Sequence, residues 1–166
     1  MRARSWISIA IFAVVAGAGA VHARTPRVRV LATGGTIAGA QASSVDKLEQ
    51  LPRVDILYAH ANMSPDLIES AVKAGAQGLV IAGVGDGNMT GPALEAITKA
   101  AKNGIVVVRS TRLPMGQVLR NNEVDDDKLG LVASGELNPP HARVLLQLAL
   151  TRTKDPTAIQ RMFYTY

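Results

Sequence analysis

The first residues whose types could do chemistry lie in the segment Thr33-Gly34-Gly35-Thr36, which follows an apolar stretch. Two adjacent glycines, Gly34 and Gly35, permit a tight turn and leave unhindered backbone N–H groups that could hold a developing oxyanion. The hydroxyl of Thr36 is a potential nucleophile, but it reacts only where a base or a lysine accepts its proton. Short Gly/Thr segments are also common as plain turns after a strand. Residue types alone favour the plain turn.

A second candidate is the glycine-rich stretch from Gly83 to Gly91. Its glycines fall as G-x-G-x-G, and Asn88 stands where a dinucleotide-binding loop needs its third glycine. The Gly-Lys-Ser/Thr sequence of a phosphate-binding loop is absent as well. The stretch therefore predicts a loop that presents Asp86, Asn88 and Thr90 to a small polar ligand. The alternative is close packing of a helix on a strand, with Thr90 capping that helix, and this alternative is favoured for the loop alone.

An acidic run, Asn121 to Asp127, is the third candidate. A run of charge is usually a solvated face in a loop, and its spacing does not fit an EF-hand calcium loop. The histidines His22, His60 and His141 are isolated, and neither an H-E-x-x-H nor a G-x-S-x-G motif occurs. His60 is interpreted as a structural histidine. We therefore expect no metal site and no serine-hydrolase site.

The elements that must position these residues alternate between strand and helix patterns. Short connections between apolar strands and amphipathic helices indicate parallel βαβ units, so we expect an α/β fold of two or three layers. In such sheets ligands bind beyond the carboxyl ends of the strands. The expected strands are Arg27–Ala32, Val54–Ala59, Gly78–Ala82, Ile105–Val108 and Gly130–Ala133, and the expected helices are Asp66–Ala74, Pro92–Lys102, Asn138–Leu150 and Asp155–Phe163.

The amino terminus has the pattern of a secretory signal peptide over residues 1–23. Arg2 and Arg4 precede an apolar run, Trp6–Ala20, which ends in Val21-His22-Ala23. The 15-residue run is shorter than the roughly 20 residues that span a bilayer, so an uncleaved anchor is the less favoured alternative. We expect an exported, periplasmic or secreted protein without stable membrane anchoring.

Composition narrows the possible partners. The net charge is +5, but the basic residues are scattered and aromatics make up only 4% of the chain. No basic stripe is interleaved with aromatics, so we expect no nucleic-acid partner. Cysteine is absent, which excludes disulfides and thiolate chemistry.

Several collinear stretches resemble the bacterial exported L-asparaginase family. The segment Leu31–Gly39 is similar to the family's N-terminal signature, and residues from about Val45 to Tyr166 are similar to its C-terminal domain. We therefore divide the chain into a signal peptide (1–23), an N-terminal catalytic-loop fragment (24–44) and an asparaginase-like C-terminal domain (45–166). The most telling stretches of this domain are Ala82–Asn88, Val108–Arg112, Glu123–Asp126, Val132–Pro139 and Ala142–Thr151.

The resemblance implies hydrolysis of L-asparagine to L-aspartate and ammonia without metal or organic cofactor, with L-glutamine as the other candidate substrate. Thr36 holds the position of the family's nucleophile. Asn88 and Glu123 match residues that hold the substrate's α-amino group in the active site of a neighbouring subunit. The resemblance also implies a homo-oligomer.

The chain departs from the family between Ser44 and Val45. The family's central region, with its H-G-T-D-T motif and the lysine of its proton relay, has no counterpart there. A nucleophile without its activating partners loses most of its reactivity, so we expect this internally shortened chain to be inactive alone. The alternative is a non-catalytic α/β module that associates with itself or with a complete relative.

Overall fold

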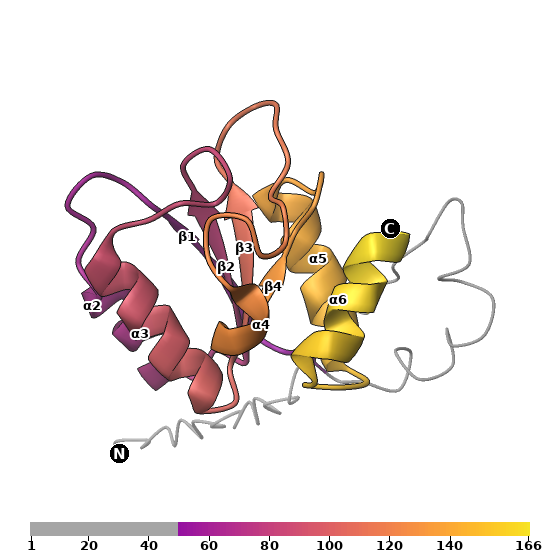
Figure 1. Cartoon of the computed structure of the whole chain (residues 1–166). Helices are drawn as coiled ribbons and strands as arrows, with labels where there is room; N and C mark the ends of the chain where they lie inside the picture. Colours follow the sequence, from indigo (N-terminus) through magenta and orange to yellow (C-terminus); the bar gives the residue numbers. More distant parts are fainter. Residues whose placement is uncertain (1–49) are drawn as a thin grey trace, which may run out of the picture. The chain divides into compact units, whose positions relative to one another are not determined.

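The computed structural model describes residues 50–166. The expected signal peptide, the Arg27–Ala32 strand and the Thr36 segment with Gly34 and Gly35 lie outside the described residues. The described part is an α/β domain with a parallel sheet between two groups of helices, which confirms the expected fold class (Figure 1).

The sheet has four parallel strands in the order β1-β2-β3-β4. Val54 of β1 is level with Gly78 of β2, and Gly78 is level with Val106 of β3. Val107 is level with Leu131 of β4. The strands are β1 (Val54–Tyr58), β2 (Gly78–Gly83), β3 (Val106–Thr111) and β4 (Leu131–Ala133). The helices are α2 (Asp66–Lys73), α3 (Gly91–Lys102), α4 (Asp126–Leu129), α5 (Pro139–Leu150) and α6 (Pro156–Thr165).

Side chains alternate between the two faces of the sheet, and both faces are covered. Val80 and Val108 pack in a core with residues of α5 and α6. Leu79 and Val107 pack in a second core with residues of α2 and α3. The domain therefore has three layers, with α2 and α3 on the opposite side of the sheet from α5 and α6 (Figure 1). Burial on both faces explains why β2 and the first half of β3, Val106–Val108, are apolar without interruption.

Polar residues begin the helices where the sequence predicts caps. Thr90 Oγ1 accepts a hydrogen bond from Ala93 N at 3.4 Å, which begins α3. Asn138 caps α5 and Asp155 caps α6 in the same way. At α2 Pro65 takes the cap position, and Ser64 Oγ accepts a hydrogen bond from Asp66 N at 3.3 Å.

Two expectations for the second half of the domain were wrong. The acidic run was expected to be a loop, but Asp125 accepts from Lys128 N at 3.0 Å and begins the short helix α4. Strand β3 was expected to end at Val108, but it continues through Arg109 to Thr111, because Arg109 finds a buried partner.

Within residues 50–166 no helix is long and apolar enough to cross a membrane.

Candidate functional site

The glycine loop follows β2 at the carboxyl end of the sheet. Val84 and Asn88 exchange two backbone hydrogen bonds of 2.8 Å, which closes the loop on itself. Gly85 and Gly87 adopt φ values of 56° and 76°, a region that glycine enters without strain. A Cβ at Gly83 would lie 2.7 Å from the carbonyl oxygen of Asn88, so the loop folds back onto a glycine. The backbone that carries Asn88 is therefore held tightly.

The three polar residues of this loop have separate roles. Asn88 is exposed. Thr90 caps α3 and donates its hydroxyl to Met63 O at 3.0 Å, so the packing role that the sequence suggested for it is confirmed. Asp86 bonds to the segment after β3: its carboxylate accepts from Leu119 N at 2.6 Å. Of the three, Asn88 alone is exposed, whereas Asp86 and Thr90 are partly buried.

Arg109 connects the loops around this site from inside the sheet. Its guanidinium pairs with Asp126 through Nε–Oδ1 at 2.7 Å and Nη2–Oδ2 at 2.8 Å. Nη1 donates to Asp86 O at 2.8 Å, and Nη2 donates to Leu119 O at 3.1 Å. One buried side chain thus binds the glycine loop, the segment after β3 and the start of α4.

Glu123 lies on a short exposed turn between Asn122 and Asp125. The turn is closed by Asn121, which has a φ of 56° and donates its backbone N–H to Asp126 Oδ2 at 2.8 Å. Because Asp126 is also bound by Arg109, the turn that carries Glu123 and the loop that carries Asn88 share one network of hydrogen bonds. The structure thus brings two of the expected site residues onto linked loops, whereas Thr36, Gly34 and Gly35 fall outside the described residues.

Sequence reasoning missed the importance of Arg109 and Asp126. The available signal was an arginine directly after the three valines of a buried strand, since a buried charge requires a partner. Nothing in the sequence indicated which of the carboxylates in the acidic run this partner would be.

The acidic run is not simply a solvated face, which corrects the expectation. Asp126 is fully buried against Arg109. Asp127 is exposed and accepts from Asn121 Nδ2 at 2.7 Å and from Arg120. The hydrogen bond from Asn121 and, to a smaller extent, that from Arg120 hold the pKa of Asp127 below its usual range.

Within residues 50–166, no group of three or more His, Cys, Asp or Glu side chains could hold a metal ion.

A shallow pocket adjoins the turn that carries Glu123. Its walls come from the segment after β3, the end of β4 and the last turn of α6, and they combine polar and apolar groups. The lining residues are Gln117, Val118, Leu119, Arg120, Asn121, Asn122, Ala133, Gly135 and Tyr164. Tyr164 is exposed. A small molecule could therefore reach the surface beside the turn that carries Glu123.

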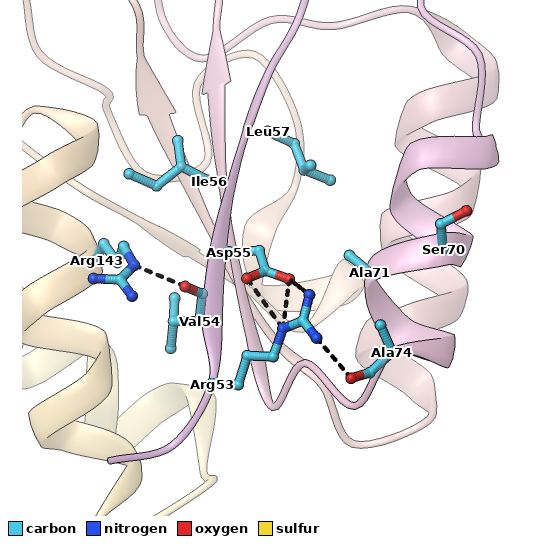
Figure 2. Close-up of a pocket in the computed structure, with 9 residues that line it drawn as sticks. All are labelled: Arg53, Val54, Asp55, Ile56, Leu57, Ser70, Ala71, Ala74 and Arg143. Carbon is cyan, nitrogen blue, oxygen red and sulfur yellow. Dashed lines mark hydrogen bonds and ion pairs between the residues drawn. The ribbon is translucent and has the colours of Figure 1, made fainter. Parts of the chain in front are cut away.

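A second depression lies along the edge strand β1, away from this site (Figure 2). Its charged groups satisfy one another: Arg53 Nε donates to Asp55 at 3.0 and 3.2 Å, and Arg53 Nη1 donates to Ala74 O at 2.8 Å. Arg143 Nε donates to Val54 O at 2.8 Å (Figure 2). The hydrogen bond and the charge of Asp55 raise the pKa of Arg53. These groups tie β1 to the helices, and none has the arrangement of a nucleophile and base.

The fold and the site define a three-layer α/β domain. Two linked loops present polar side chains beyond the carboxyl ends of its strands, which is where such sheets bind ligands. Residues 53–163 match the family model described as the glutaminase/asparaginase C-terminal domain. The chain belongs to this family, which confirms the resemblance seen in the sequence.

Curated relatives agree with this assignment. The chain is 54% identical over 120 residues to "Probable L-asparaginase periplasmic" of Haemophilus influenzae, covering 72% of this chain and 34% of the relative. It is 52% identical over 122 residues to "L-asparaginase 2" of Escherichia coli, covering 74% and 35%. "Glutaminase-asparaginase" of Acinetobacter glutaminasificans is 41% identical over 126 residues, covering 74% and 38%. The chain thus spans about a third of the length of these relatives.

Proposed function

We propose that this chain is an L-asparaginase-type amidohydrolase whose described domain holds the α-amino group of L-asparagine through Asn88 and Glu123, in an active site shared with another subunit. The observation that supports this most is the network through which Arg109 joins the loop of Asn88 to the turn of Glu123. Linked loops keep two substrate-binding groups in a fixed relation, and such positioning is a main source of catalytic power.

The chemistry of the two side chains suits this role. An α-ammonium group has three N–H donors, and the carboxylate of Glu123 and the amide oxygen of Asn88 are acceptors. Both residues are exposed in loops that follow the carboxyl ends of β2 and β3. Exposed groups are accessible to a substrate that is bound mainly by another subunit.

In the proposed reaction, Thr36 Oγ1 attacks the carbon of the side-chain amide and transfers its proton to a base. The N–H groups of Gly34 and Gly35 stabilise the oxyanion, and the base returns the proton to the amide nitrogen, which leaves as ammonia. Water then hydrolyses the resulting ester to release L-aspartate and the free Thr36 hydroxyl. No metal or organic cofactor is required. Because the chain carries no H-G-T-D-T motif, we propose that it releases little ammonia alone.

The substrate and location are parts of the same proposal. L-asparagine is the first candidate, and L-glutamine is the second because some relatives are named glutaminase-asparaginase. The apolar run Trp6–Ala20 after Arg2 and Arg4 supports export, and one relative is named periplasmic.

Complementation tests the proposal directly. A full-length relative, with the residues aligned to Asn88 and Glu123 changed to alanine, is mixed with this chain, and ammonia release from L-asparagine is measured. We expect the unmodified chain to restore activity and the Asn88→Ala/Glu123→Ala variant to fail. Equal activity with both versions would contradict the binding role. The chain alone should release no more ammonia than its Thr36→Ala variant, and a clear excess would contradict the proposed impairment.

A second candidate function is a non-catalytic module that associates with itself or with a relative. The observation that favours it is a set of exposed apolar side chains near the carboxyl edge of the sheet: Tyr58, Val84, Leu113, Met115 and Leu119. Exposed apolar side chains that form a continuous patch often mark a contact surface. Light scattering of the purified chain tests it, and a strict monomer that binds no relative would exclude it.

A further inference from the structure

A carboxylate–amide contact joins the two loops of the candidate site directly. Asp86 Oδ2 accepts a hydrogen bond from Asn122 Nδ2 at 2.6 Å, and Asp86 Oδ1 accepts from Leu119 N at 2.6 Å. Asp86 is two residues before Asn88, and Asn122 is the residue before Glu123. The contact therefore spans the two segments that carry the proposed substrate-binding groups.

We infer that Asp86 is a positioning residue that couples the loop of Asn88 to the turn of Glu123, so that the two move as one unit. The coupling is a property of the described residues, and its consequence for substrate binding rests on the proposed function. Both carboxylate oxygens of Asp86 are bonded within the chain, which assigns this carboxylate to positioning the two segments.

The backbone around Asp86 directs its carboxylate toward the second segment. Asp86 lies between Gly85 and Gly87, which have positive φ values, at the tip of the closed glycine loop. Its carbonyl oxygen accepts from Arg109 Nη1 at 2.8 Å, and Arg109 itself is buried in the sheet. Because the main chain of Asp86 is anchored in this way, the side chain has a fixed origin from which to reach Asn122 and Leu119.

The contact uses both carboxylate oxygens of Asp86 as hydrogen-bond acceptors. A carboxylate offers two acceptor oxygens, whereas an amide offers one oxygen and one NH2 group. In Asp86→Asn the exposed amide of Asn122 can turn its oxygen toward the new NH2 group, so both contacts can form again, but each is then a hydrogen bond between neutral groups and is weaker than one to a carboxylate. Exchanging the two side-chain types, in Asp86→Asn/Asn122→Asp, returns a carboxylate to the contact between the two loops while an oxygen still faces Leu119 N.

The chain contains a matched control. Asp127 makes a similar carboxylate–amide contact with Asn121 Nδ2 at 2.7 Å, but both residues lie within the same segment. Asp127→Asn therefore weakens the contacts of this carboxylate with Asn121 and Arg120 without touching the glycine loop. If Asp86 acts only as an ordinary surface acceptor, the two substitutions should have the same local effect.

Backbone hydrogen exchange of the full chain tests the coupling. In Asp86→Asn we expect hydrogen exchange at residues 83–90 and 117–125 to rise together by about tenfold, because two hydrogen bonds to a charged group become weaker ones to a neutral group. The Asp86→Asn/Asn122→Asp double variant should return hydrogen exchange in both segments to the rate of the unmodified chain. Asp127→Asn should affect residues 120–128 alone. Faster exchange in only one segment, or no recovery in the double variant, would overturn the coupling.

The complementation assay adds a functional readout. Combined with a full-length relative as above, Asp86→Asn should raise KM for L-asparagine several-fold with kcat retained, and the double variant should restore KM. An unchanged KM beside faster exchange would overturn the positioning role. If the unmodified chain restores no activity, the proposed function fails, and hydrogen exchange still decides whether the loops are coupled.

Discussion

Arg109 and Asp126 form a two-point ion pair inside the domain, with Nε–Oδ1 at 2.7 Å and Nη2–Oδ2 at 2.8 Å. Their side chains are 1% and 0% exposed. The remaining N–H groups of Arg109 bind the carbonyl oxygens of Asp86 and Leu119, and Asp126 also accepts from Asn121 N. The pair therefore satisfies three backbone groups, in the glycine loop and in the segment after β3, that have no strand or helix partner at those positions.

Removing one member of this pair should destabilise the domain strongly. Arg109→Met leaves the carboxylate of Asp126 buried without its partner, and we expect the free energy of unfolding to fall by about 3–5 kcal/mol. Urea denaturation followed by circular dichroism measures this loss. In Arg109→Met/Asp126→Leu the uncompensated charge is gone, so part of the stability should return.

The ion pair of Arg53 and Asp55 supplies the control. Arg53 Nη2 lies 2.8 Å from Asp55 Oδ2, but the two side chains are 50% and 28% exposed. Arg53→Met should leave the urea midpoint nearly unchanged, because exposed ion pairs contribute little. Equal losses from Arg53→Met and Arg109→Met would show that burial of the second pair is not what matters.

The sequence predicted the strands and most helix starts because those signals are local. Buried parallel strands appear as short apolar runs, as at Gly78–Ala82, and capping residues such as Thr90 and Asn138 act on the next three residues. The layering was left open between two and three layers. It depends on which helix covers which face, and this is decided by packing between distant residues.

The network of the candidate site could not be predicted for the same reason. Arg109 and Asp126 are 17 positions apart, and Asp86 and Asn122 are 36 positions apart. No period or motif joins them, and three adjacent aspartates offered equal candidates for the partner of Arg109. Only Asp126 is buried, because Asp125 caps α4 and Asp127 lies on the exposed side of that helix.

Gln160 should stabilise the outer edge of β4. Its Oε1 accepts from Ala133 N at 2.8 Å and its Nε2 donates to Ala133 O at 3.1 Å, so this side chain takes the place of a neighbouring strand. Gln160→Met should lower the free energy of unfolding by about 1–3 kcal/mol, because two buried backbone groups lose their partners. Gln147→Met is the matched control. Gln147 makes one longer bond, 3.2 Å to Pro52 O, and its loss should shift the urea midpoint less.

Gly83→Ala should open the glycine loop. The added methyl group would lie 2.7 Å from Asn88 O and 2.6 Å from Gly87 O, so the backbone must shift. We expect a loss of about 1–3 kcal/mol, typical of overpacking, and faster hydrogen exchange at Val84 and Asn88. Gly91→Ala places its methyl group in open space and should be neutral or slightly stabilising. A Gly83→Ala protein as stable as Gly91→Ala would contradict the tight closure.

The contact between Asn121 and Asp127 should appear in the acid titration. The pKa of Asp127 is lowered first by the hydrogen bond from Asn121 and then by that from Arg120. A carboxylate with a depressed folded-state pKa contributes stability above its unfolded pKa, and this stability is lost as the pH falls through the folded value. Asn121→Gly keeps the positive φ but removes the amide, so the pKa of Asp127, followed by NMR, should move up toward its ordinary value. An unchanged titration would show that Asn121 does not stabilise the charged form.

The exposed apolar side chains near the carboxyl edge should govern association with another subunit. Met115 is 87% exposed in the segment after β3, and Leu113 and Leu119 of the same segment are exposed as well. Met115→Glu places a charge where an apolar contact would form. Losing the burial of one such side chain corresponds to about 1.5–3 kcal/mol, so we expect the dissociation constant to rise by about tenfold or more. Analytical ultracentrifugation of the chain, alone and mixed with a full-length relative, measures the change.

The control for this prediction is Val144→Glu, because Val144 is an exposed apolar residue in the middle of α5, away from the carboxyl edge. Val144→Glu introduces the same charge on the same fold, so any general effect of charge on solubility should appear in both variants. A weaker association in Met115→Glu alone would assign the contact to the segment after β3. Equal weakening in both variants, or none in either, would mean that the subunits meet through another surface, and Asn88 and Glu123 would then have no reason to reach a neighbouring active site.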